Sequence, residues 1–274
     1  MPPIIWTLTD AGVETLGLED NNLTSLSEDL GNLDGLTELY LRKNQLAALP
    51  SSIEKLVNLD SLYLEDNQLT NAGIPDGLEN CKQMKGITLQ RNRLTAFPTQ
   101  LIQLRALEEM YFDGNAIGVI PDEIGFLKEL REIGFQGCKI KEIPRTIGHC
   151  VKIEIIHIEH NELEVLPKTM GRLKALTKIY INDNKLIKLH ASLAKCPKIQ
   201  VINAEDNCIK GISKKIAALP KLKHLLLANN ELKELPPEIT KMAGGLRRLT
   251  LSGNKLQKDV MKLEKLGDLG GIAE

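Results

Sequence analysis

The stretch that decides the fold is residues 36–58, Leu-Thr-Glu-Leu-Tyr-Leu-Arg-Lys-Asn-Gln-Leu-Ala-Ala-Leu-Pro-Ser-Ser-Ile-Glu-Lys-Leu-Val-Asn. Its first part follows the pattern L-x-x-L-x-L-x-x-N-x-L, and its second part follows L-P-x-x-I-x-x-L. The first pattern occurs eleven times in the 274 residues, so internal repetition is the main signal in this chain. The repeats start at Val13, Leu36, Leu59, Met84, Leu107, Leu130, Ile153, Leu176, Ile199, Leu222 and Leu246.

The apolar columns of the repeat predict its structure. The x-L-x-L part alternates, which is typical of a short strand with one buried face. Stacked repeats would place these strands in one parallel sheet and would bury positions 1, 4, 6 and 11 of each repeat. We therefore predict an α/β fold. It is a single solenoid of about eleven 23-residue repeats, with a parallel β-sheet on the concave face and short helical or irregular segments on the convex face.

Two polar columns are interpreted as structural. Position 9 is Asn in ten of the eleven repeats and Cys138 in the remaining one. A buried Asn there would bond backbone groups of its own and of the neighbouring repeat. Position 15 is Pro in seven of ten repeats, with Ser27, His190 and Ser213 as exceptions. Proline presets φ where the chain would enter the convex segment.

The repeat boundaries predict three segments, namely an N-terminal cap at residues 1–12, the solenoid at residues 13–256 and a C-terminal cap at residues 257–274. The ends of a repeat stack need cover for their exposed core. Ile5, Trp6 and Leu8 suit this role at one end, and Val260, Met261, Leu263 and Leu266 suit it at the other.

Composition narrows the class of protein. Lys and Arg number 35 and Asp and Glu number 36, so the chain has no overall basic bias and we expect no nucleic-acid partner. No stretch approaches the roughly 18 apolar residues of a membrane span, and no secretory signal is recognisable. Four cysteines fall in buried columns and none forms a Cys-x-x-Cys pair, which predicts free thiols and a cytoplasmic location. Only Cys208 is expected to reach solvent.

These repeats resemble those of the leucine-rich-repeat superfamily. The L-P-x-x-I-x-x-L half and the 23-residue length are similar to the intracellular Ras-group class, which includes the Ras suppressor protein and Scribble-type scaffolds. The resemblance covers about Val13 to Leu256. It implies a non-enzymatic protein-binding module, either a scaffold or an adaptor in signal transduction, that uses its concave face.

Positions 3, 5, 7 and 8 of each repeat are expected on the concave face. All four tyrosines of the chain occupy position 5, and tyrosine is a common interface anchor. The four columns hold twelve acidic and five basic residues, a net charge of −7, which favours a partner with a basic or mixed-charge surface. The predicted protein-binding residues are Tyr40, Tyr63, Tyr111, His157, Tyr180, Glu109, Asp113, Glu159, Asp183 and Glu205.

Two smaller features of this face have alternative interpretations. Gly114, Gly134 and Gly137 lack side chains at concave positions, which suggests a notch between Tyr111 and His157. The glycines would equally serve to accommodate Phe112 and Phe135 in the core below. We predict no cofactor.

Other classes of function are ranked below the binding module. The sequence His157-x-Glu159-His160, followed by Asp183 in the next repeat, has ligand types that bind metals, but the residues lie on an open surface. We therefore predict no metal site, no catalytic residue and no enzyme activity. An inhibitor or regulatory subunit of an enzyme such as a phosphatase is the main alternative, and a metal-dependent enzyme is a remote one.

Overall fold

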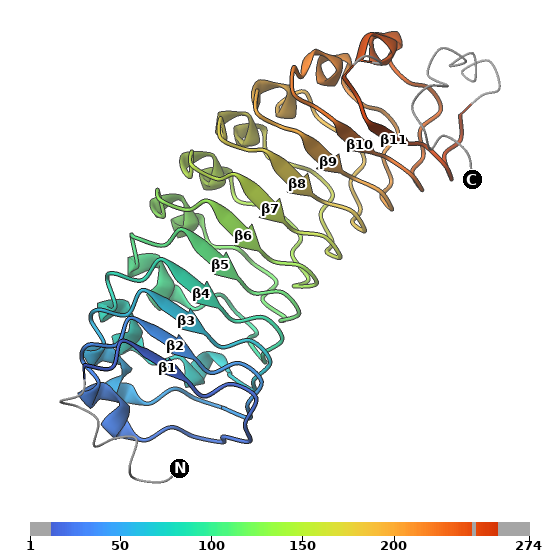
Figure 1. Ribbon diagram of the computed structural model, residues 1–274. Coiled ribbons are helices and arrows are strands. Elements are labelled where there is room, and N and C mark those ends of the chain that lie inside the picture. Colours follow the sequence, from blue (N-terminus) through green and yellow to red (C-terminus); the bar gives the residue numbers. More distant parts are fainter. Residues whose placement is uncertain (1–11, 243–244, 257–274) are drawn as a thin grey trace. The chain divides into compact units, whose positions relative to one another are not determined.

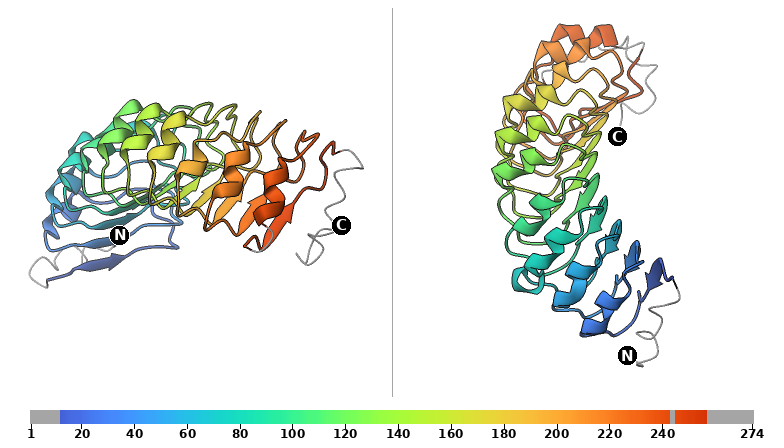
Figure 2. Two further views of the ribbon diagram at one scale, coloured as in Figure 1. Left: turned by 90° about the horizontal axis from the view of Figure 1, so that it is seen from above. Right: turned by 90° about the vertical axis from the view of Figure 1, so that its left-hand side faces the viewer.

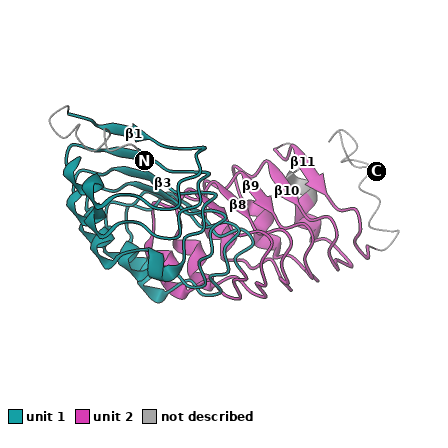
Figure 3. Ribbon diagram, turned by 90° about the horizontal axis from the view of Figure 1, so that it is seen from below, with its two compact units in different colours: residues 1–138 teal, residues 139–274 magenta. Residues whose placement is uncertain are grey.

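A computed structural model describes residues 12–242 and 245–256 of the chain (Figure 1). The chain divides into two compact units, unit 1 within residues 1–138 and unit 2 within residues 139–274 (Figure 3). Both predicted caps lie outside the described residues, apart from Gly12 at the end of the first. The predicted boundaries of the caps and the solenoid therefore remain a prediction.

Unit 1 contains a parallel sheet whose strands follow the order of the sequence. Its described strands are β1 (Thr15–Gly17), β2 (Glu38–Tyr40), β3 (Ser61–Tyr63), β4 (Gly86–Thr88), β5 (Glu109–Tyr111) and β6 (Glu132–Gly134). Each residue pairs with the residue at the same repeat position in the next strand, as Leu39 pairs with Leu62. The identical register follows from the repeat, because a slip by one residue would turn every buried leucine toward solvent.

Unit 2 repeats this arrangement. Its described strands are β7 (Ile155–His157), β8 (Lys178–Tyr180), β9 (Val201–Asn203), β10 (His224–Leu226) and β11 (Arg248–Thr250). They are parallel and pair in register, as His157 with Tyr180 and Tyr180 with Asn203. The predicted repeat fold with parallel strands is confirmed in both units.

Short 3-10 helices lie on the side of each unit opposite the strands (Figure 2). In unit 1 they are η2 (Glu28–Asn32), η3 (Ser51–Lys55), η4 (Asn71–Gly73), η5 (Asp76–Asn80), η6 (Thr99–Gln103) and η7 (Asp122–Phe126). In unit 2 they are η8 (Arg145–His149), η9 (Lys168–Arg172), η10 (Leu193–Lys195), η11 (Lys214–Ala218) and η12 (Pro237–Met242). The strand surface of each unit, formed by repeat positions 3, 5, 7 and 8, is called the strand face below.

The position-15 column explains where most of these helices begin. A proline precedes the helix in most repeats, as Pro50 precedes η3 with φ of −68°. The three exceptions place a side-chain acceptor there instead. Ser27 Oγ accepts from the backbone N–H of Asp29 at 3.1 Å, Ser213 Oγ from that of Lys215 at 3.3 Å, and His190 Nδ1 from that of Ser192 at 3.0 Å. The side chains of Ser27 and Ser213 thus cap η2 and η11 in place of the preset φ of proline. His190 instead bonds the N-cap residue of η10, Ser192, whose own side chain makes no cap.

The leucine and asparagine columns form the interior of each unit. Leu39, Leu41 and Leu46 have no exposed surface, and the aligned residues of the next repeats are buried in the same way. Asn67 is typical of the position-9 column. Its amide nitrogen donates to the carbonyls of Leu41 at 2.9 Å and Leu64 at 3.1 Å, and its Oδ1 accepts from the N–H of Leu46 at 3.0 Å. The predicted structural role of the asparagines is confirmed.

The predicted free state and burial of the cysteines are also confirmed. All five cysteines are free thiols, and Cys81, Cys138, Cys150 and Cys196 are buried. Cys138 takes part of the role of the missing asparagine, because its Sγ lies 3.2 Å from the carbonyl of Phe112. Only Cys208 is partly exposed.

Candidate protein-binding surface

The tyrosine column of unit 1 begins with a stacked pair. Parallel pairing in register places Tyr40 beside Tyr63, and their ring centroids lie 4.5 Å apart with the planes within 9° of parallel. The hydroxyl of Tyr40 donates to Glu38 Oε2 at 3.0 Å. This hydrogen bond is the main reason that the pKa of Tyr40 rises to about 12, so the phenol stays protonated at neutral pH. Both rings are half-buried, which leaves part of each for a partner.

The third tyrosine of unit 1 lies among carboxylates. Burial raises the pKa of Tyr111, and the negative charge of Glu132 on the neighbouring strand raises it further. Partial burial also raises the pKa of Glu109, with Glu132 and Glu108 as further causes. Of the predicted site residues in unit 1, Glu109 is exposed, and Tyr111 and Asp113 are half-buried. Asp113 also serves the fold, because its Oδ1 accepts from the backbone N–H of Gln136 at 2.7 Å.

The notch predicted at Gly134 is filled, and that interpretation is wrong within unit 1. A Cβ atom added to Gly134 would lie 2.7 Å from the ring of Tyr111 and 2.9 Å from the carboxylate of Asp113. The missing side chain is thus replaced by its neighbours. Below it, Phe112 and Phe135 stack in the core with centroids 5.0 Å apart.

The presence of glycine at the other two positions is explained by the backbone conformation, which the sequence did not predict. Gly114 and Gly137 occupy position 8, with φ of +72° and +64°. Position 8 is left-handed in every repeat, and its eight residues other than glycine have φ between 51° and 58°. They are Asp20, Lys43, Asp66, Arg91, His160, Asp183, Asp206 and Asn229. Gly, Asn and Asp tolerate this conformation best, so the composition of this column is partly set by the turn.

Unit 2 carries a second stacked pair. His157 and Tyr180 lie on paired strands with centroids 4.9 Å apart and planes within 8° of parallel. His157 Nδ1 is 3.7 Å from a carboxylate oxygen of Glu159, whose side chain is 14% exposed. Asp183 is held by His160, with Nδ1 2.5 Å from Oδ2. The two repeats that carry this aromatic pair thus also hold three polar side chains on the strand face of unit 2, Glu159, His160 and Asp183.

The last predicted binding residue of unit 2 is Glu205, which follows β9. Its side chain contacts β11, which is not the neighbouring strand of the sheet. The hydroxyl of Thr250 on β11 donates to Glu205 Oε1 at 2.6 Å. Position 7 of the repeat between them is Ala228, whose small side chain leaves room for this contact. Glu205 is therefore half-buried and contributes to the strand face and to the cohesion of unit 2.

The predicted acidic excess is unevenly distributed between the units. Positions 3, 5, 7 and 8 carry a net charge of −5 in unit 1 and −2 in unit 2. At position 8 of unit 1 the acidic residues are neutralised within the chain, since Asp20 contacts Lys43 at 3.2 Å and Asp66 contacts Arg91 at 2.5 Å. The remaining charge of unit 1 therefore lies mostly in positions 3 and 7.

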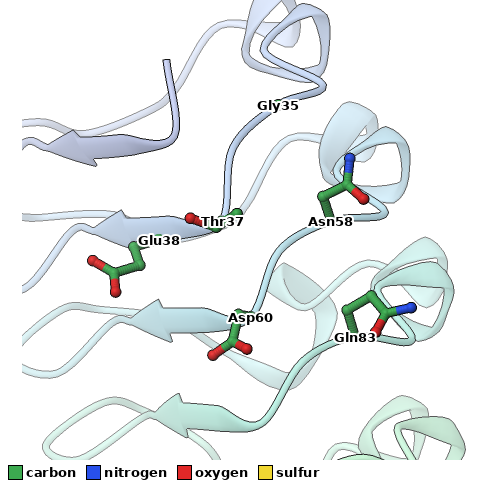
Figure 4. Close-up of a pocket in the computed structure, with 6 residues that line it drawn as sticks. All are labelled: Gly35, Thr37, Glu38, Asn58, Asp60 and Gln83. Atoms are coloured by element: carbon green, nitrogen blue, oxygen red, sulfur yellow. The ribbon is translucent and has the colours of Figure 1, made fainter. Parts of the chain in front are cut away.

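A depression that no sequence pattern predicted lies at the beginning of the strands of unit 1 (Figure 4). It has a volume of about 570 Å³ and is lined by Gly35, Thr37, Glu38, Asn58, Asp60 and Gln83. Its residues come from positions 2 and 3 of the repeat and from the segment just before each strand. Asp60 is paired with Lys85 at 2.5 Å, whereas Glu38 also faces the tyrosine column through Tyr40. No short sequence motif marks such a site, because its lining is scattered over three repeats.

Within residues 12–242 and 245–256, no group of three or more His, Cys, Asp or Glu side chains has the geometry to hold a metal ion. No helix in that part of the chain is long and apolar enough to cross a membrane.

The family profile described as Leucine rich repeat matches residues 11–69 and 175–232. The chain has the leucine-rich-repeat fold. Each unit contains one of the matched segments, and the strands and asparagine columns between them continue the same pattern.

Solved structures with this fold are similar to the chain at low sequence identity. An internalin, InlF, from Listeria monocytogenes has 19% identity and a TM-score of 0.72, over 98% of this chain and 87% of that one. A TDR receptor has 22% identity and a TM-score of 0.77, over 98% of this chain and 52% of that one. A chain of the Toll–Spatzle complex from Drosophila has 20% identity and a TM-score of 0.71, over 95% of this chain and 38% of that one.

A search of curated proteins gives no significant match. Matching chains of solved structures number 508, so this fold is common and does not select a function by itself. The function has to be argued from the strand face of each unit.

Proposed function

We propose that this leucine-rich-repeat protein is a non-enzymatic protein-interaction module that binds its partner on the strand face. The observation that carries the proposal is the aromatic column, with stacked pairs Tyr40–Tyr63 and His157–Tyr180 held half-exposed on polar sheets. Rigid aromatic groups with a polar tip are typical anchors of protein interfaces. Tyrosine at this column is also a good strand former, so the pairs serve the fold and the interface together.

The charge of the strand face indicates the kind of partner. Unit 1 carries the larger acidic excess on this face, and Glu109 there is exposed beside other carboxylates. A partner with a basic or mixed-charge surface would reduce this repulsion, which favours association. The Toll structure was solved as a complex with Spatzle, which supports protein binding as a use of this fold.

The proposed location is the cytoplasm, and the proposed role is that of an intracellular scaffold or signalling adaptor. Five free cysteines, four of them in the core, suit a reducing compartment. The resemblance to the intracellular Ras-group repeats supports the same compartment.

Partner capture with matched variants tests the proposal. One variant removes the aromatic pair of unit 1 (Tyr40→Ala with Tyr63→Ala), and a second removes that of unit 2 (His157→Ala with Tyr180→Ala). The control is Val119→Ala with Val165→Ala, since these valines are 67% and 57% exposed away from the strand face. We expect a protein retained by the wild type and the control to be lost from at least one aromatic variant.

Loss of the partner from the valine control alone would contradict the proposal and would place the interface elsewhere. The identity of the captured protein separates a scaffold from the alternative, an inhibitor or regulatory subunit of an enzyme. Thermal melting of each variant shows whether the fold is retained.

A further inference from the structure

A gap on the strand face of unit 1 lies beside Tyr40, one strand before the tyrosine pair. Position 5 of β1 is Gly17, which pairs with Tyr40 and is exposed. Tyr63 covers one face of the Tyr40 ring, so the opposite face is directed toward Gly17. Among the described residues, the atoms nearest to a Cβ position at Gly17 are those of the Glu19 carboxylate. This position of the column therefore has the Tyr40 ring beside it and the end of the flexible Glu19 side chain above it.

This gap differs from the filled one at Gly134. At Gly134 a Cβ atom would meet the ring of Tyr111 at 2.7 Å. At Gly17 the nearest atoms to such a Cβ belong to the carboxylate of Glu19, the closest at 2.9 Å. The space above Gly17 is thus bordered by a ring and a carboxylate, and the carboxylate lies at the end of a flexible side chain.

A second carboxylate lies at the other end of the ring. Glu38 accepts the hydrogen bond of the Tyr40 hydroxyl through Oε2, and it also lines the depression at the beginning of the strands (Figure 4). Among the described residues, neither Glu19 nor Glu38 forms an ion pair with a cationic side chain. The acidic groups at position 8, by contrast, are paired within the chain.

We propose that this site binds an arginine side chain of a basic peptide segment in the partner protein. The planar guanidinium group would stack on the open face of Tyr40 above Gly17, and its N–H groups would donate to Glu19 and Glu38. Guanidinium groups stack on aromatic faces and form paired hydrogen bonds with carboxylates, which a lysine ammonium group does less well. The site rests on the proposed binding function of the strand face and specifies one anchor of the partner.

The probes for the test are tetra-arginine and tetra-lysine peptides with a fluorescent label, titrated with the full chain at about 50 mM NaCl. We expect tetra-arginine to bind more tightly than tetra-lysine, by at least about fivefold. Glu38→Gln should weaken tetra-arginine binding about tenfold, as expected for the loss of one charge-assisted hydrogen bond. The matched control is Glu123→Gln, which removes the same charge from the exposed η7 of the same unit, on the side opposite the strands, and it should change the affinity by less than about twofold.

A steric variant tests the gap without changing charge. Gly17→Leu places a side chain at position 5, where β10 already has Leu226, and the φ of Gly17 is not in the left-handed region. We expect this variant to fold and to lose tetra-arginine binding.

Three outcomes would overturn the assignment. They are tetra-lysine binding within twofold of tetra-arginine, equal losses in Glu38→Gln and Glu123→Gln, and unchanged binding by a folded Gly17→Leu variant. If one of these outcomes is found and the aromatic variants still lose the captured partner, only the arginine site is rejected and the proposed function stands. If both aromatic variants retain the captured partner, the proposed function is rejected whatever the peptide titration shows.

Discussion

From Asn44 onward, each asparagine of the position-9 column joins its own repeat to the preceding one through its side-chain amide. Asn67 bonds Leu41 and Leu46 of the preceding repeat and Leu64 of its own, and only 7% of its surface is exposed. No other small side chain offers both a double donor and an acceptor of this shape, which explains why one residue type fills nearly the whole column.

Replacement of this residue should therefore be costly. We expect Asn67→Ala to lower the free energy of unfolding by about 1–3 kcal/mol, because it leaves buried backbone groups without partners. Urea unfolding measures the change. The neighbouring substitution Gln68→Ala is the control, since Gln68 is half-exposed, and equal losses in both variants would contradict the structural role of the column.

The buried thiols allow a prediction of pH dependence. Burial raises the pKa of Cys81 and of Cys196 from 9.0 to about 11. The folded chain therefore holds these protons more tightly than the unfolded chain does. Their contribution to stability is complete below pH 9 and is lost as the pH rises through 11.

Urea unfolding at pH 8 and pH 10 checks this contribution in the wild type and in a Cys81→Ala, Cys196→Ala variant. The variant should lose less stability between the two pH values than the wild type does. In native labelling with a thiol reagent at pH 8, Cys208 should react quickly and the four buried cysteines slowly. Rapid labelling of a buried cysteine would show that its repeat opens readily.

At the scale of one element, the two-residue insertion in the third repeat forms the extra helix η4. Asn71 Oδ1 accepts from the backbone N–H groups of Thr95 at 2.8 Å and Ala96 at 3.1 Å, and its amide donates to Ala96 O at 2.7 Å. Gly73 packs closely on the preceding repeat, where its carbonyl accepts from the N–H of Leu49 at 2.9 Å. The insertion is thus bonded to the repeats on both sides.

Two glycine-to-alanine substitutions in unit 1 test this packing. A Cβ at Gly73 would lie 2.2 Å from the backbone oxygen of Ala47, so Gly73→Ala should force the backbone apart and cost about 1–3 kcal/mol. A Cβ at Gly86 would meet only Ser61 Oγ at 3.7 Å, so Gly86→Ala in β4 should be neutral or stabilising by less than about 1 kcal/mol. Thermal and urea unfolding compare the two variants. A neutral Gly73→Ala would mean that η4 moves freely.

At the scale of the whole molecule, charge is balanced in total and sorted by surface. The net charge is −1, yet the four strand-face columns carry −7. The rest of the chain therefore carries +6. Sorting of this kind would direct the basic partner that we propose to the strand face of each unit during diffusional encounter.

Association with the captured partner should therefore depend on ionic strength. We expect an increase from about 50 to 300 mM NaCl to lower the association rate about tenfold and to change the dissociation rate much less. Stopped-flow or surface-based kinetics measures both rates. In a Glu38→Gln, Glu109→Gln variant the salt dependence should be shallower. A wild-type association rate that does not change with salt would show that the acidic excess has no steering role.

The sequence by itself determined the repeat fold of this protein, the parallel strands, the asparagine column and the burial of four cysteines. These features depend on which residue type recurs at each position of a 23-residue period, and a period is visible in a linear sequence. The same reasoning placed the tyrosines in one column and predicted an acidic strand face.

Only the tertiary structure decided how neighbouring side chains in these columns use the available space. It showed that Tyr111 fills the gap at Gly134, that Tyr40 stacks on Tyr63, and that the flexible carboxylate of Glu19 lies over Gly17. It also showed that position 8 is left-handed and that its acidic residues are paired in unit 1. The physical reason is that side-chain orientation depends on neighbours in the adjacent repeat, about 23 residues away in sequence, and the repeat pattern specifies their positions but not their orientations.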